Sequence, residues 1–498
     1  LFLFFILLWR QYPGLVASFK KFQADFMAMD RGKKIYSVFG GALCLLILGV
    51  SFYAARLPPH LPQELDVINY HMMIPRQHLI LGSFDPLRWS SADLFLLPID
   101  FALAPFWLAT PLPNKWPQFF FLIGLLLVCW SLAGRFSGDH FLTKILVVFA
   151  LLASHNIGIQ AGTGMLGLVA TYLFFAAWDS FFKGKVFLSA VETAFYFWSK
   201  PFIPLEGILV ILGLIFLYVF LRKLWGAEIR VGYVEGCMIS PSSFKECFLR
   251  LKSAVWIFIV ISLVVAGPFV FKSLRHSGTP LYPFGAGTVM IGRAIDTNTL
   301  QWRSIIENSR RLVGVKDSYG SGRSALDFIK HFWVVAIPEN GVNNRYDYPL
   351  GLIYLLCAGP FLYIFVRSLR QKQFLIFYLL PVIGWFSWWM TTQQTRLLYI
   401  SVVLMVLSVV SVMAFHTRMF RGCVLLALAL TSLSVFRAHA PDFRKSAWES
   451  VRREDKELIM MSIDTGAGKP AVLKRHDVAF AEFPVAAVDS DYILVLKF

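Results

Sequence analysis

Long apolar runs recur along most of this chain and constrain its fold more than any other feature. A helix of about 20 apolar residues crosses the hydrocarbon core of a bilayer with all its backbone groups hydrogen-bonded. Hydrophobic residues make up 57% of the 498 positions and charged residues only 15%, against about 25% in soluble domains. The pattern predicts an all-α polytopic membrane protein with about 12 transmembrane helices. We expect them near residues 1–9, 36–55, 117–134, 140–155, 162–182, 186–200, 204–222, 254–272, 350–367, 373–390, 396–414 and 421–436.

The basic residues, which give the chain a net charge of +17, indicate how these helices are oriented. No polar basic domain suited to nucleic acid is visible, so we assign the excess charge to loops on the cytoplasmic side. These basic loops are residues 10–35, 183–185, 222–253, 367–372 and 418–421. The large first loop, 56–116, and the long loop 273–349 then face outward. This holds if the proline-containing stretch 94–112 forms a juxtamembrane element and does not cross.

The last part of the chain differs from the rest. Residues 1–436 are predicted to form the transmembrane domain, and residues 437–498 a small α/β segment outside the membrane. The segment SAWESVRREDKELIMM has helical periodicity with mixed charge, whereas PAVLKR, DVAFAEF and DYILVLKF are short strand-like runs.

The stretch QELDVINYHMMIPRQH, residues 63–78, gathers ionisable side chains at the start of the first outer loop. Asp66 could take a proton from an attacking hydroxyl, and with Glu64 it could hold a divalent cation. A helical conformation would place Asp66 and Tyr70 on one face, with His71 beside them. Because a Glu-x-Asp pair alone is common, a solvated loop with incidental charges stays open as the alternative.

Two cations are predicted on the same outer side. Lys200 in WSKPF ends one apolar helix, and Arg396 in TTQQTR begins another. Each could serve as an interfacial anchor. Each could also bind a phosphate, which the planar guanidinium of arginine does well. Cations that face a carboxylate across an outer cavity would suit a phosphorylated, lipid-borne substrate.

Four segments, taken together and in this order, resemble elements of bacterial membrane glycosyltransferases of the C-type superfamily (GT-C). These segments are DVINYHMMIPRQHLILGSF, WSKPF, HSGTPLYPF and TTQQTRLLYISVVLM. The likeness spans residues 1–436 and extends to relatives of the protein mannosyltransferases and of the aminoarabinose transferase. The chain departs from the family pattern in three places. HNIGIQAGTGMLG lacks a second acid, GTP stands at 278–280 where relatives often have GNP, and the final element lacks its usual proline.

The resemblance implies a hexosyl- or pentosyltransferase in the bacterial cytoplasmic (inner) membrane. Its active site would face the periplasm and move a sugar from a polyprenyl-phosphate donor to an envelope glycan, lipid or protein, with inversion. Asp66 would be the general base, Glu64 would tune it or share a Mg²⁺ or Mn²⁺ ion with it, and Lys200 and Arg396 would stabilise the departing phosphate. The remaining predicted substrate-binding residues are Tyr70, His71, Arg76 and Tyr282.

Other classes of protein stay open at this point. A lipid-linked sugar flippase also needs outer cations, but it needs no general base. An O-antigen ligase or polymerase would depend on arginine and histidine more than on Asp66. A structural subunit of an envelope complex would need neither. The absence of a sequence repeat and the gathering of charge at one face favour an enzyme over a transporter.

Overall fold

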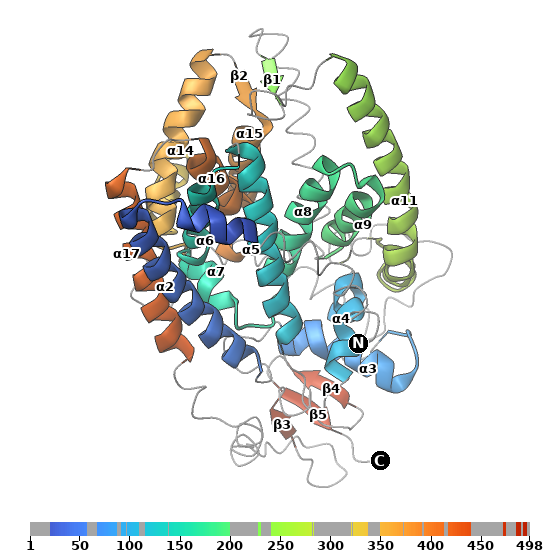
Figure 1. Ribbon diagram of the computed structural model, residues 1–498. Helices are drawn as coiled ribbons and strands as arrows, with labels where there is room; N and C mark the ends of the chain where they lie inside the picture. Colours follow the sequence, from blue (N-terminus) through green and yellow to red (C-terminus); the bar gives the residue numbers. More distant parts are fainter. Residues whose placement is uncertain are drawn as a thin grey trace.

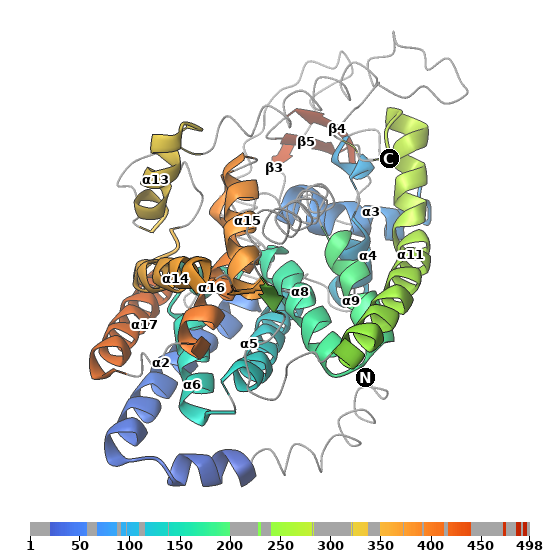
Figure 2. The same cartoon turned by 90° about the horizontal axis from the view of Figure 1, so that it is seen from above.

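The computed structural model describes the following residues: 20–56, 67–86, 91–95, 97–108, 115–137, 139–199, 228–230, 241–280, 282, 320, 322–336, 349–371, 373–390, 393–412, 417–439, 472–474, 485–489 and 492–495. Most of them are helical, and the helices form a bundle (Figures 1 and 2).

Ten described helices correspond to predicted membrane helices. They are α2 (Arg31–Ala55), α5 (Trp116–Phe136), α6 (Phe141–Leu152), α8 (Gly167–Phe182), α9 (Val186–Phe197), α11 (Pro241–Ser277), α14 (Leu352–Gln371), α15 (Ile376–Met390), α16 (Tyr399–Val412) and α17 (Arg418–His439). Among the described residues, four apolar segments are long enough to cross a bilayer: α2, α5, α17 and the part of α11 from Lys252 to Ser277. The chain is therefore a multi-pass membrane protein. The predicted helices 1–9 and 204–222 lie outside the described residues, so the total of about 12 stays a prediction.

Hydrogen bonds at the helix ends show which ends lie together. The Lys115 N–H donates to the Ala55 carbonyl at 2.7 Å, and the His155 N–H donates to the Leu350 carbonyl at 3.2 Å. We call this end of the bundle the loop end. At the opposite end, which carries the predicted cytoplasmic loops, Lys21 forms an ion pair with Asp139. There β1 (Glu228–Arg230) also pairs in parallel with β2 (Gln373–Leu375), at the top of Figure 1.

The core of the bundle surrounds α16, whose described side chains are almost all buried, as expected for a helix that is apolar on every face. Its first residue, Tyr399, donates a hydrogen bond to Asn156 Oδ1 at 2.5 Å in α7 (His155–Gln160). Small residues let the helices approach one another. A Cβ added to Gly124 would lie only 2.7 Å from the Tyr172 ring, so α5 and α8 pack more closely than alanine would allow.

The first outer loop folds into short elements at the loop end. They are the π-helix η1 (Val67–Met72), α3 (Met73–Leu81), the 3-10 helix η2 (Ser91–Leu94) and α4 (Pro98–Leu108). The 11 residues of α4 span about 16 Å at 1.5 Å per residue, against the roughly 30 Å of a hydrocarbon core. Alone, α4 is shorter than a bilayer, but so are α6 and α9 with 12 residues each, so the juxtamembrane position of 94–112 stays a prediction.

In the tail, β3 (Val472–Lys474) and β4 (Val485–Asp489) pair antiparallel with β5 (Tyr492–Val495), in the order β3-β5-β4. Strands β3 and β5 lie within predicted strand-like runs. The predicted helix at 446–461 lies outside the described residues, so the α/β segment and its boundary at 437 stay predictions.

Candidate functional site

A buried His–Asp contact joins η1 to α4 at the loop end. His71 Nδ1 lies 2.8 Å from Asp100 Oδ1, and the two side chains are 2% and 0% exposed. An ionised carboxylate can only accept, so Nδ1 carries the hydrogen in this contact. His71, predicted to support substrate binding, is therefore fixed by an acid 29 positions along the chain.

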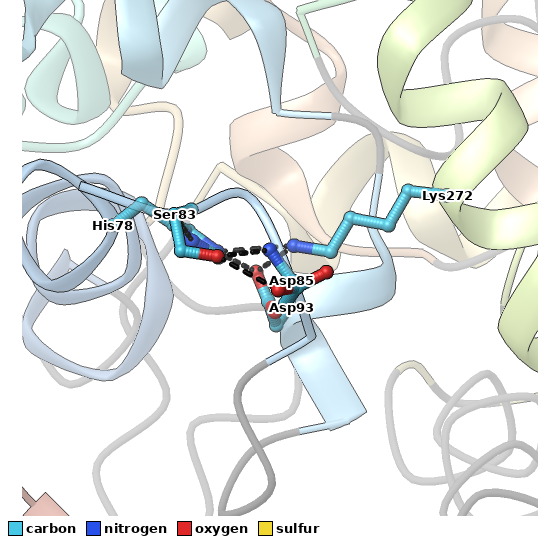
Figure 3. A network of polar contacts seen from close by, with 5 residues as sticks. All are labelled: His78, Ser83, Asp85, Asp93 and Lys272. Carbon is cyan, nitrogen blue, oxygen red and sulfur yellow. Dashed lines mark hydrogen bonds and ion pairs between the residues drawn. The ribbon is translucent and has the colours of Figure 1, made fainter. Parts of the chain in front are cut away.

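A second buried contact joins the same loop to α11 (Figure 3). Asp93 Oδ1 lies 2.6 Å from His78 Nε2 and 2.7 Å from Lys272 Nζ, and these two nitrogens are 3.0 Å apart. His78 Nδ1 donates to the Ser83 carbonyl at 2.7 Å. His78 comes from α3, Asp93 from η2 and Lys272 from the last turns of α11, so one cluster fastens three elements together.

An apolar cluster, here called the first-loop cluster, fixes the residue that follows Asp66. Its members are Val67, Met72, Ile99, Leu103, Ala104, Met165, Leu166, Val169 and Leu173. Val67 is fully buried and packs against the backbone at Gly164, where an added Cβ would lie 2.6 Å from Val67 Cγ1. Glycine at 164 is therefore what allows the start of η1 to approach the segment between α7 and α8.

Arg396, predicted to bind phosphate, contacts the same cluster. It lies in η4 (Thr395–Leu397) and is half-buried. Its Nε and Nη2 donate to Gln394 Oε1 at 3.3 and 3.2 Å, and its Nη1 lies 3.7 Å from Met165 Sδ. The guanidinium is thus oriented by an amide oxygen beside Met165 of the first-loop cluster.

The turn before Arg396 is held by α13 (Ala325–Val334). Gln393 has a positive φ of 52°, and its Oε1 lies 3.0 Å from Nε2 of the buried His331. Its Nε2 donates to the carbonyls of Gly322 at 2.8 Å and Trp389 at 3.1 Å. The two glutamines thus have separate roles: Gln393 binds α13 to the turn, and Gln394 bonds the arginine.

The end of α9 packs against the same cluster. Ser199 is buried and donates to the Tyr196 carbonyl at 2.7 Å. Tyr196 is partly buried and packs against the first-loop cluster. Ser199 directly precedes Lys200, which lies outside the described residues.

The other predicted residues fall as follows. Glu64 and Asp66 lie outside the described residues, and so do the side chains of Tyr70 and Arg76, whose backbones belong to η1 and α3. Tyr282 is fully buried, with its ring centroid 5.8 Å from that of Phe95. The roles predicted for these residues stay predictions.

Sequence reasoning missed Asp93, Asp100 and Lys272 as partners of the loop histidines. Their signal is that each ionisable residue lies in or beside an apolar run, where a charge needs a partner. The identity of the partner is not visible in the sequence, since Lys272 lies 194 positions from His78.

Within the described part of the chain, no group of three or more His, Cys, Asp or Glu side chains could hold a metal ion. The divalent cation predicted at Glu64 and Asp66 therefore stays a prediction, because both residues lie outside that part.

No family model and no curated protein matches the chain. Two solved structures do, both of ArnT from Cupriavidus metallidurans. The structure bound to undecaprenyl phosphate is 14% identical, with a TM-score of 0.46 over 84% of this chain and 68% of that one. The apo structure is 14% identical, with a TM-score of 0.43 over 86% and 63%. ArnT is a GT-C aminoarabinose transferase, the group that the sequence motifs resemble. Both TM-scores lie under 0.5, so the function of this chain has to rest on its own residues.

Proposed function

We propose that this protein is a membrane glycosyltransferase that moves a sugar from a polyprenyl-phosphate donor to an envelope glycan, lipid or protein at the outer face of the cytoplasmic membrane. One observation carries the proposal. Val67, which follows Asp66, belongs to the first-loop cluster, Arg396 contacts it through Met165, and Tyr196 near Lys200 packs against it. Arg396 thus contacts this small cluster, and two described residues close in sequence to Asp66 and Lys200, namely Val67 and Tyr196, belong to it or pack against it.

The proposed reaction is a single displacement. Asp66 removes the proton from an acceptor hydroxyl or amine as that atom attacks the anomeric carbon. The bond between the anomeric carbon and the phosphate oxygen breaks, and its electron pair leaves with the polyprenyl phosphate. Attack opposite the leaving group inverts the anomeric centre. Arg396 and Lys200 stabilise the negative charge that develops on the departing phosphate.

The bonding of Arg396 supports its role at the phosphate. Gln394 Oε1 receives two guanidinium N–H groups at 3.2 and 3.3 Å, which fixes the plane of the fork. Guanidinium groups bind phosphate through parallel N–H bonds, so a fixed plane reduces the entropy lost on binding. Gln394 is itself held in place, because Trp388 Nε1 donates to the Gln394 backbone carbonyl at 2.6 Å.

The test is release of free polyprenyl phosphate by the purified protein in lipid, with a panel of polyprenyl-phosphate sugars and an acceptor extract. We expect Asp66→Ala to abolish release and Arg396→Gln to lower it, by about 10²-fold if one charge-stabilising donor is lost. Asp25→Ala is the matched control, since Asp25 lies in the predicted cytoplasmic loop 10–35. Sensitivity to EDTA tests the cation predicted at Glu64 and Asp66.

Other results would favour other classes. Donor binding without release by the wild type, together with donor movement across the bilayer, would replace the enzyme with a flippase. Release that survives Asp66→Ala but not Arg396→Gln would favour a ligase- or polymerase-like mechanism. No binding of any donor would remove the proposal altogether.

A further inference from the structure

The ion cluster of His78, Asp93 and Lys272 takes no part in the proposed chemistry. We propose that these are positioning residues for the transferase. They fasten α3, and with it the start of η1, to α11, and His78 replaces Lys272 as the cation of the cluster when the lysine charge is removed. The link to sugar transfer depends on the proposed function, whereas the anchor depends on the cluster alone.

The proton on His78 Nε2 determines which hydrogen bond this nitrogen makes within the cluster. His78 Nδ1 donates to the Ser83 carbonyl, so only Nε2 is variable. Without a proton, Nε2 accepts from the Lys272 ammonium 3.0 Å away. With a proton, Nε2 donates to Asp93 Oδ1 at 2.6 Å and faces that ammonium as a second cation. Lysine and a doubly protonated histidine are therefore alternative cations for the same carboxylate oxygen.

Because the cluster is buried, the presence of a cation beside Asp93 strongly affects stability. Lys272 is 5% and Asp93 is 1% exposed at the side chain. The rings of Phe84, Phe101 and Phe269 pack on one another in this region, and Lys272 Nζ lies 4.5 Å from the centroid of Phe84. Removing the cation from a buried ion pair strongly destabilises the folded protein, whereas removing it from an exposed ion pair has little effect.

Other titratable groups surround the cluster and must be separated from it. Asp85 and His276 lie within electrostatic range of Lys272, and Arg275 lies on the same helix, one turn beyond the lysine. On η1 and α4, His71 is bonded to Asp100. Since His276 also changes charge near neutral pH as a residue type, a pH effect must be shown to need His78.

The anchor is connected to the candidate site through a continuous helix. η1 begins at Val67 and runs directly into α3, which carries His78. On the other side, α11 contacts both η2 and α4. Release of His78 from α11 would therefore loosen the helix whose first residue follows Asp66.

The experiment compares Lys272→Met with Lys252→Met, the same change at an exposed position earlier in α11. At about pH 8 we expect Lys272→Met to transfer sugar about tenfold more slowly than wild type, or slower still, because Asp93 loses the ammonium that lies 2.7 Å from its Oδ1. At about pH 6, where histidine ordinarily takes up its second proton, the rate should return to within about threefold of wild type at that pH. Lys252→Met should match wild type at both pH values. Lys272→Met/His78→Asn should not recover.

A second readout does not depend on activity. Amide hydrogen exchange across residues 67–81, normalised to the intrinsic rate at each pH, should be faster than in wild type for Lys272→Met at about pH 8 and normal at about pH 6. Purification at the lower pH keeps this variant in its predicted folded state. Unchanged exchange at both pH values, or recovery without His78, would overturn the anchor. Faster exchange with normal transfer would overturn the positioning role. Wild-type protein that transfers nothing would overturn the proposed function, while exchange alone would still decide the anchor.

Discussion

A size exchange between Gly164 and Val67 tests whether the first-loop cluster positions the segment after Asp66. A Cβ at Gly164 would lie 2.6 Å from Val67 Cγ1, whereas ordinary contacts begin at 3.4 Å. Gly164→Ala therefore forces a shift of about 0.8 Å at this contact. Overpacking of this kind costs about 1–3 kcal/mol of stability. A displacement near 1 Å can cost about 10²-fold in rate, so we expect a loss between tenfold and about 10²-fold.

Val67→Ala removes the clashing methyl group. The remaining Val67 Cβ would lie 3.5 Å from the added carbon, which is an ordinary contact. Alone, Val67→Ala loses two buried methyl groups, or about 1.6 kcal/mol of transfer free energy, plus a cavity term. In Gly164→Ala/Val67→Ala the new methyl group partly fills that cavity. The double variant should therefore be more stable and more active than the two single effects predict, by about 1–2 kcal/mol of coupling.

The assay is sugar transfer together with thermal unfolding in detergent, for wild type, both single variants and the double variant. Gly49→Ala is the control, because nothing lies within 4 Å of a Cβ added there. If the losses in the double variant are simply additive, the two residues do not constrain each other and the close approach described here is wrong. If unfolding shows coupling and transfer does not, the cluster is structural and does not position the site.

Three further predictions concern the rest of the bundle. Gln393→Ala should lower the free energy of unfolding by about 1–3 kcal/mol in thermal unfolding, because it removes the amide that contacts the buried His331 and donates to the Gly322 and Trp389 carbonyls. The hydrogen bond from Lys144 lowers the pKa of Asp139, so its ionised form adds stability that is fully present above its ordinary value of 3.8 and is lost as the pH falls through the lowered value. Asp139→Asn keeps a residue type that tolerates the positive φ of 66°, and its stability deficit should shrink only below pH 3.8. Tyr399→Phe should lower the free energy of unfolding by about 1 kcal/mol or more in thermal unfolding, because it removes the hydroxyl that donates to the buried Asn156 Oδ1.

Apolar length made most of the helix bundle predictable, because the thickness of a bilayer sets the length of a spanning helix. Apolar length marks only the apolar part of a helix. The helix predicted at 254–272 begins at Pro241 in the structure, since the charged residues before Lys252 continue α11 without an apolar signal. The short helices of the first outer loop were predictable in kind, through the prolines and acids of 94–112, but not in their boundaries.

The candidate site was less predictable, because its contacts join residues from distant parts of the sequence. The local spacing of QELDVINYHMMIPRQH suggests that all its ionisable groups could act on substrate. In the structure, His71 and His78 are buried against acids 29 and 15 positions away. No pattern within the stretch could separate them from Asp66, since the distinction lies in residues that the chain brings in from α4, η2 and α11.

The burial of His71 and His78 suggests that they and Asp66 have different roles in the first outer loop. A general base must reach an acceptor that comes from solvent or from the membrane surface. His78 would have to give up its buried carboxylate partner to do this, because its Nδ1 already donates to the Ser83 carbonyl, and an uncompensated buried carboxylate is costly. His71 keeps Asp100 on Nδ1, but its side chain is only 2% exposed. Either histidine can therefore influence transfer most readily by holding η1 and α3 in place. The proton transfer is then better assigned to Asp66, directly before the first residue of that helix, and substitution of either histidine should alter transfer and amide exchange together.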